Sequence, residues 1–301
     1  MQIENINYEI LAPAGQILAE SASWSYRDKS LWWVDIRAHQ VKRWSSCNDK
    51  IDIWLMPEIC AAVIPTSGGQ VVVALREGLH LLDPKTGEVI NLLKLENNLP
   101  ENRLNEAKCD RQGRLWCGSM WDFGKHPTGS LYRIDSDLKV SMIRGGLTIP
   151  NGLAFSPNGK EMFFVDSITG CIECADYDTH TGTPGPWRKF VQEDTLQGLP
   201  DGGTVDTDGC VWSTRYGAGC IARYTPNGKL DRLIHLPISQ PTSCTFGGEN
   251  LDTLFITSAS QRMSSQALLA EPLAGAVLSI RPGVQGLPEP AFILKSKKII
   301  H

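Results

Sequence analysis

The chain has 301 residues, of which 42% are hydrophobic and 21% are charged, with 28 glycines and 18 prolines. Its 29 lysines and arginines nearly balance its 33 acidic residues, which leaves a formal charge of −4. This composition is that of an ordinary globular chain and argues against a disordered, collagen-like or disulfide-stapled one. Balanced charge without long runs of one sign also argues against nucleic acid and anionic membranes as partners.

The N-terminal region predicts no export. The first thirty residues contain Glu4, Glu9 and Glu20 and no basic segment followed by an apolar core, so we expect no secretory signal. No apolar run approaches the roughly 20 residues that a membrane-spanning helix needs. Nine cysteines is an odd number, and without an export signal we expect reduced thiols that pack as small hydrophobic groups. Together these features predict a cytoplasmic protein.

One pattern recurs along the chain: a turn rich in Asp, Asn and Gly, a short apolar strand, a few polar residues and a further strand. The apolar strands are predicted at residues 31–35, 71–75, 115–118, 162–166, 211–214 and 254–257. Their starts are 40, 44, 47, 49 and 43 residues apart, a period typical of propellers and other repeat folds. The turns at 110–113, 156–159 and 206–209 begin with Asp or Ser and end with Gly, as hairpin turns do.

Evenly spaced short strands with Gly-rich turns predict an all-β chain. Six copies of four strands predict a six-bladed β-propeller with four-stranded antiparallel blades, forming one domain over residues 1–301. A pair of β-sandwiches is the alternative, disfavoured because no change of composition divides the chain. Helical apolar spacing first occurs at residues 264–269. Closure of the ring would require residues near 8–11 to pair with strands of the last blade.

The innermost strand of each propeller blade lines the central channel, so residues at one phase of the repeat form a ring. Counting back 10 to 12 residues from each apolar strand reaches six ring positions: Glu20, Cys60, Asn105, Asn151, Asp201 and Thr242. Four of the six carry a carboxylate or a carboxamide, whose oxygens suit a hard or borderline divalent cation. The alternative is that these side chains cap turns or bond to the backbone at the channel mouth.

Other site chemistries find little support. There is no Gly-x-Ser-x-Gly nucleophile elbow and no phosphate-binding loop, and the six histidines never pair at the spacing of a helical zinc site. The turn at 206–209 lacks the further oxygen ligands of an EF-hand. Trp33, Trp116 and Trp212 recur in the apolar strands, where we expect them to pack in the core.

Four short motifs surround the polar ring positions. They read Glu20-Ser21-Ala22-Ser23-Trp24, Arg103-Leu104-Asn105-Glu106, Pro150-Asn151-Gly152-Leu153 and Pro200-Asp201-Gly202-Gly203. At these residues the chain resembles the family of gluconolactonase, regucalcin and luciferin-regenerating enzyme, and within it the bacterial sugar-acid lactonases. The first motif lacks the Gly-Pro pair of the family's Glu-Gly-Pro-x-Trp, and the second has Glu where the family has Asp.

The resemblance covers essentially the whole chain and implies roles for six residues. One divalent metal ion, with Ca, Zn, Mn, Mg and Fe(II) all compatible, would be held by Glu20, Asn151 and Asp201. Arg103 and Asn105 would contact the substrate, and Asp122 would replace a family glutamate that contacts a sugar hydroxyl. Asp201 would also accept a proton from the attacking water and return it to the leaving alkoxide.

The resulting hypothesis is a metal-dependent hydrolase that opens a sugar-acid lactone to the free aldonic acid in carbohydrate catabolism. Its partner would be a small sugar lactone, and the protein would be a monomer or a small homo-oligomer. Two alternatives stay open. One is a non-catalytic propeller that binds a metal or a protein, and the other is a hydrolase of another ester or a phosphotriester with the same metal.

Overall fold

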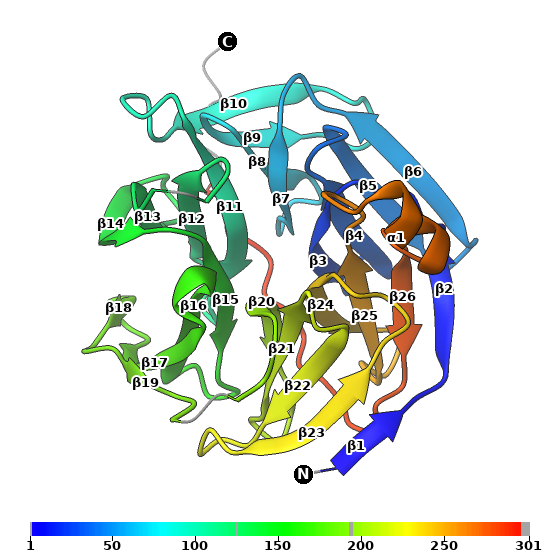
Figure 1. Ribbon diagram of the computed structural model, residues 1–301. Helices are drawn as coiled ribbons and strands as arrows, with labels where there is room; N and C mark the ends of the chain where they lie inside the picture. The colour runs from blue at the N-terminus through cyan, green and yellow to red at the C-terminus, as the bar shows by residue number, and fades with distance from the viewer. Residues whose placement is uncertain (1, 125, 193–194, 296–301) are drawn as a thin grey trace.

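The computed structural model describes residues 2–124, 126–192 and 195–295. Figure 1 shows six β-sheets arranged around a central axis, which confirms the six-bladed propeller. The strands of each blade are given from the inner to the outer one. Blade 1 consists of β3 (Ala19–Ser25), β4 (Ser30–Asp35), β5 (Gln40–Ser45) and β6 (Lys50–Leu55), and blade 2 of β7 (Cys60–Pro65), β8 (Val71–Leu75), β9 (Gly78–Leu82) and β10 (Val89–Lys94). Blade 3 consists of β11 (Asn102–Cys109), β12 (Leu115–Trp121), β13 (Gly129–Ile134) and β14 (Val140–Leu147).

The other three blades follow the same plan with small departures. Blade 4 consists of β15 (Pro150–Phe155), β16 (Glu161–Asp166) and β17 (Cys171–Asp178) with β18 (Thr183–Pro184) and β19 (Arg188–Lys189). Blade 5 consists of β20 (Leu199–Val205), β21 (Val211–Tyr216), β22 (Cys220–Tyr224) and β23 (Leu230–His235). Blade 6 consists of β24 (Pro241–Gly247), β25 (Thr253–Ser258), β26 (Val277–Ile280) and β2 (Tyr8–Ala12). The outer strand of blade 4 is divided into two short pieces that both pair with β17.

The N-terminal segment closes the ring. Strand β2 pairs antiparallel with β26, with Tyr8 opposite Ile280, so the predicted closure through residues 8–11 is confirmed. Strand β1 (Gln2–Asn5) adds a fifth, parallel strand to the outer edge of blade 5 beside β23, which the repeat pattern did not predict. Residues 2–12 therefore connect the last two blades.

The second strand of each blade is buried on both faces because neighbouring blades pack face to face. Trp32 and Trp33 are consecutive in β4, so their side chains point to opposite faces. Trp32 packs in the apolar cluster between blades 1 and 2, and Trp33 in the cluster between blades 6 and 1. Trp33, Trp116 and Trp212 are all buried, as predicted. Burial on two sides explains why these strands are continuous apolar runs in the sequence.

Every inner strand changes its pairing register close to its ring position. The changes lie at Glu20/Ser23, Cys60/Ala62, Leu104/Ala107, Asn151/Ala154, Pro200/Gly203 and Pro241/Cys244. A bulge of this kind bends a strand and redirects a side chain. The six ring positions are thus the places where the inner strands depart from regular pairing next to the channel.

The C-terminal segment crosses the channel at one end. Phe292 is fully buried and bridges to Thr66 in blade 2. Glu289 accepts a hydrogen bond from Thr204 Oγ1 (3.1 Å), and its Oε1 lies 3.5 Å from Lys108 Nζ. Figure 1 shows this segment, in red, passing behind the inner strands, so the site is expected at the other end of the channel.

Two short helices complete the described structure. They are η1 (Ser167–Thr169) after β16 and α1 (Ser265–Ala270), whose N-cap Ser264 accepts a hydrogen bond from the Ala267 backbone N–H at 3.1 Å. Helix α1 overlaps residues 264–269, the segment whose apolar residues have helical spacing in the sequence. Within the described ranges, no helix has the length and apolar character to cross a membrane. All nine cysteines are free thiols, in agreement with the expected reduced state.

Candidate functional site

A cavity of about 140 Å³ lies at the open end of the channel, and its lining includes all six residues proposed for the site. They are Glu20, Arg103, Asn105, Asn151, Asp201 and Asp122. The two remaining ring positions make other contacts: Thr242 Oγ1 donates to the Ala19 carbonyl, and Cys60 Sγ donates to the Asp35 carbonyl at 3.9 Å. The polar ring positions therefore converge, while the Cys and the Thr belong to the packing between blades.

A chain of hydrogen bonds crosses blades 3, 4 and 5 inside the cavity. Arg103 Nη1 donates to Asn105 Oδ1 (2.7 Å), and Asn105 Nδ2 donates to Asn151 Oδ1 (2.9 Å). Asn151 Nδ2 donates to Ser167 Oγ (2.9 Å), which donates to the Pro200 carbonyl (2.7 Å). Asn105, Asn151 and Ser167 each accept one of these hydrogen bonds and donate another, which fixes the orientation of both carboxamides before any ligand binds.

Two carboxylates, the buried Asp201 and the partly buried Glu20, line the same cavity. Burial raises the pKa of Glu20 to about 7. Burial, together with the negative charge of Glu20, raises the pKa of Asp201 well above its usual range. Asp201 Oδ1 is buried and accepts no hydrogen bond from any residue in the described ranges. A buried carboxylate oxygen without a partner is uncommon, and two close carboxylates favour a proton or a cation between them.

The donor set here fits a divalent cation. Glu20 and Asp201 supply carboxylate oxygens and Asn151 supplies a carboxamide oxygen, the ligand types that hard cations prefer. Asn151 Oδ1 already accepts one hydrogen bond but retains a second lone pair. Among the described residues, no three His, Cys, Asp or Glu side chains form a cluster that could hold a metal. A cation would therefore depend on the amide as well as on the two carboxylates.

Asp122 is surrounded by three guanidinium groups. Its carboxylate oxygens lie 2.7 Å from Arg103 Nε, 3.0 Å from Arg37 Nη2 and 3.2 Å from Arg76 Nη2. Burial acts to raise the pKa of Asp122, but the hydrogen bond from Arg37 and the charge of Arg103 outweigh it, so its pKa lies below the usual range. Asp122 thus holds the arginines in place, and its predicted contact with a sugar hydroxyl stays a prediction.

Sequence reasoning missed several residues that contact the predicted ones. Arg37, Arg76 and Ser167 lie just after the ends of β4, β8 and β16, the second strands of blades 1, 2 and 4. The ring positions lie 10 to 12 residues before the apolar strands, whereas these three residues lie only five or six residues after the starts of those strands at Leu31, Val71 and Met162. Glu106 was also missed as a contact between blades: its Oε2 accepts a hydrogen bond from the Leu153 N–H at 2.8 Å.

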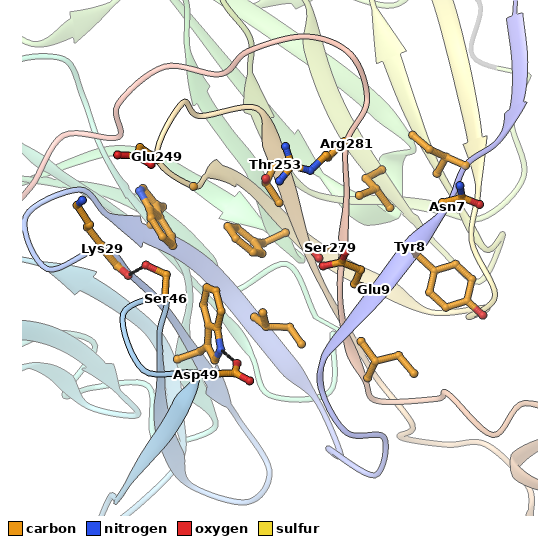
Figure 2. Close-up of a pocket in the computed structure, with 18 of the residues that line it drawn as sticks. Asn7, Tyr8, Glu9, Lys29, Ser46, Asp49, Glu249, Thr253, Ser279 and Arg281 are labelled. Carbon is orange, nitrogen blue, oxygen red and sulfur yellow. Dashed lines mark hydrogen bonds between the residues drawn. The ribbon is translucent and has the colours of Figure 1, made fainter.

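A larger groove of about 840 Å³ lies outside the channel, between β2 and the turns of blade 1. Figure 2 shows Tyr8 and Glu9 on one side of this groove and Lys29, Ser46 and Asp49 on the other. It contains none of the six residues proposed for the site. We therefore assign the candidate site to the smaller cavity, where carboxylates, carboxamides and guanidiniums converge.

Fold and site together define a six-bladed propeller with a polar cavity, built from the inner strands, at the open end of its channel. A family model described as "SMP-30/Gluconolactonase/LRE-like region" matches residues 18–260. The match extends from the first blade into the sixth and includes every residue of the candidate site. The chain therefore belongs to the SMP-30/gluconolactonase/LRE-like family.

Individual relatives match over nearly the whole chain. A 6-deoxy-6-sulfogluconolactonase of Pseudomonas putida is 32% identical over 278 residues, which cover 92% of this chain and 95% of that protein. An L-arabinolactonase of Azospirillum brasilense is 32% identical over 288 residues, 94% of each chain. The crystal structure of regucalcin from Agrobacterium tumefaciens, described as a calcium-binding protein, matches with a TM-score of 0.93 and 27% identity over 97% of this chain and 99% of that one.

Proposed function

We propose that this protein is a metal-dependent lactonase that opens a sugar-acid lactone to the free aldonic acid. The observation that carries the proposal is the unpartnered, buried Asp201 Oδ1 in a cavity shared with Glu20, Asn151 and Arg103. Relatives named as lactonases, which match more than nine-tenths of this chain, support the reaction class. A non-catalytic propeller that binds a metal is the second candidate, because the chain also matches the regucalcin structure described as calcium-binding. No observation on the site favours a phosphotriester over a lactone.

Glu20, Asn151 and Asp201 would hold the cation. When bound, a divalent cation supplies Lewis-acid polarisation of a carbonyl group and lowers the pKa of water. Calcium, magnesium, manganese, zinc and Fe(II) all accept oxygen ligands, so this donor set does not choose among them. Calcium is the first to test because the regucalcin structure is described as calcium-binding.

Asp201 is the proposed general base and acid. A water oxygen forms a bond to the lactone carbonyl carbon while Asp201 accepts the proton that this water loses. The bond between the carbonyl carbon and the ring oxygen then breaks, and Asp201 returns the proton to that oxygen. The products are a carboxylic acid and a free hydroxyl group, so one water is consumed for each lactone opened.

Arg103 is suited to stabilise the charge that develops on oxygen. Its guanidinium group is held from two sides, by Asp122 and by Asn105, so its orientation is set before the substrate arrives. Fixed donors of this kind stabilise an oxyanion without reorganisation during the reaction. Asn105 and Asp122 would position the sugar hydroxyls, because both line the cavity beside Arg103.

The test is turnover of a panel of sugar lactones by the wild type and by Asp201→Asn. We expect kcat to fall by about 100- to 10,000-fold in Asp201→Asn, the range that loss of an acid–base group typically costs. Asp176→Asn is the matched control, because Asp176 is exposed on the outer part of blade 4. Wild-type turnover in Asp201→Asn would contradict the assigned role, and no turnover by the wild type on any lactone would favour the non-catalytic propeller.

We also propose that residues 1–301 act as one domain in the cytoplasm, as a monomer or a small homo-oligomer. Light scattering on the purified protein measures the assembly state. A mass above that of a small oligomer would contradict this part of the proposal.

A further inference from the structure

Positive charge gathers in the lining of the cavity. Arg37, Arg103 and Arg262 all line it, and Arg37 and Arg262 lie in loops that follow the second strands of blades 1 and 6. These blades are neighbours at the closure of the ring. The loop that carries Arg262 is fixed there by a hydrogen bond from the Gln261 N–H to the Ile17 carbonyl at 2.9 Å.

The carboxylates of the site do not neutralise these arginines. Asp122 is the single carboxylate within ion-pair distance of Arg37, Arg76 and Arg103 among the described residues, so three positive charges share one negative charge. The other two carboxylates that line the cavity are the ones assigned to the divalent cation. With that cation bound, an excess of positive charge remains around Asp122 and Arg262.

Arg262 adds a further unpaired charge. Its side chain is exposed, and it makes no hydrogen bond or ion pair with any residue in the ranges that the structure describes. Its backbone has φ of +61°, a left-handed conformation that is uncommon for residues other than glycine and that often occurs at functional sites. Arg37, in contrast, is held over the Phe123 ring at 5.5 Å as well as by Asp122.

We propose that the substrate lactone carries an anionic substituent, a sulfonate or a phosphate, at the end remote from the lactone carbonyl, and that Arg262 binds it together with Arg37. This inference rests on the proposed lactonase function. A guanidinium group presents a planar fork of donors that matches the oxygens of such an anion. A neutral sugar would bring no charge to offset this excess.

The experiment compares kcat/KM for three lactones with the same ring: gluconolactone, its 6-phosphate and its 6-deoxy-6-sulfonate. We expect the wild type to prefer at least one anionic lactone by about tenfold or more, the usual scale for a hydrogen bond to a charged group. Arg262→Gln should lower the ratio of anionic to neutral kcat/KM about tenfold, and Arg262→Lys should restore part of it. Because Arg262 is exposed, its charge should also make the ratio fall as salt is added.

Arg281→Gln is the matched control, because Arg281 is another exposed arginine but lines the groove outside the channel. It should leave the ratio at the wild-type value. The two anionic lactones distinguish a sulfonate from a phosphate. Equal or better turnover of the neutral lactone, or an unchanged ratio in Arg262→Gln, would overturn this inference while leaving the lactonase standing. Failure to open any of the three would overturn this inference, and failure on the wider lactone panel as well would overturn both.

Discussion

Asp122→Asn tests whether the site depends on charge pairing in the lining of the cavity. The Asp122 side chain is 9% exposed, and that of Arg103 is 5% exposed, so their 2.7 Å contact is shielded from solvent. Removing one partner of a buried ion pair typically costs about 3–5 kcal/mol, because the other charge stays buried without compensation. Asparagine keeps the size and one acceptor oxygen, so we expect a loss of about 2–4 kcal/mol in the free energy of unfolding.

The lowered pKa of Asp122 predicts how the loss of stability in Asp122→Asn changes with pH. The pKa of Asp122 is lower in the folded protein than in the unfolded chain, so its ionisation contributes stability at neutral pH. That contribution is lost as the pH falls from about 4, the usual pKa of an aspartate in an unfolded chain, towards the lower pKa of Asp122 in the folded protein. Urea unfolding of the wild type and of Asp122→Asn should therefore differ most near neutral pH, and the difference should shrink in acid.

Asp52→Asn is the matched control. Asp52 also faces two cations, Arg43 at 2.6 Å and Lys50 at 2.7 Å, but it lies on the outer strand β6 with 22% of its side chain exposed. Exposed pairs are worth about 0–1 kcal/mol, so this variant should unfold almost as the wild type does. Equal losses for the two variants, or a loss in Asp122→Asn that does not change with pH, would refute the reasoning.

Three further predictions concern the supports of the site. Gly152→Ala should lower the free energy of unfolding, measured by calorimetry, by about 1–3 kcal/mol, because Gly152 has φ of +62° and a Cβ there would lie 2.6 Å from a Val165 methyl group. Gly217→Ala should lower it less, because Gly217 has φ of +84° but open space around a Cβ, and equal losses for the two variants would contradict this account. Ser167→Ala should lower stability by about 1–3 kcal/mol and reduce kcat, since it leaves two buried groups unpaired; wild-type kinetics would argue against it. Removal of residues 2–12 should lower the melting temperature by exposing the outer edges of blades 5 and 6, and an unchanged melting curve would refute that role.

Much of the fold could be predicted from the sequence because one physical unit recurs. The second strand of each blade is buried on both faces, which makes it a continuous apolar run that stands out at every repeat. Strand β1 could not be found in this way. It adds to blade 5 through backbone pairing with β23, and that pairing depends on the closed ring bringing distant segments together.

The site was only partly predictable for a similar reason. Counting along the repeat identified Glu20, Asn151 and Asp201 because residues of one phase converge on the channel. It did not identify Arg37, which lies 85 residues from Asp122 in the chain and contacts it within the cavity. Nor did residue type alone reveal that Asp122 would be shared among three arginines, since that depends on how loops from different blades meet.

The central claim, a sugar lactonase that needs a divalent cation, is tested most directly by lactone hydrolysis before and after removal of metal. The purified wild type should open sugar lactones, lose that activity after complete chelation and dialysis, and regain it when one of the candidate divalent cations is added back. Full hydrolysis by protein shown by elemental analysis to contain no metal would contradict the account.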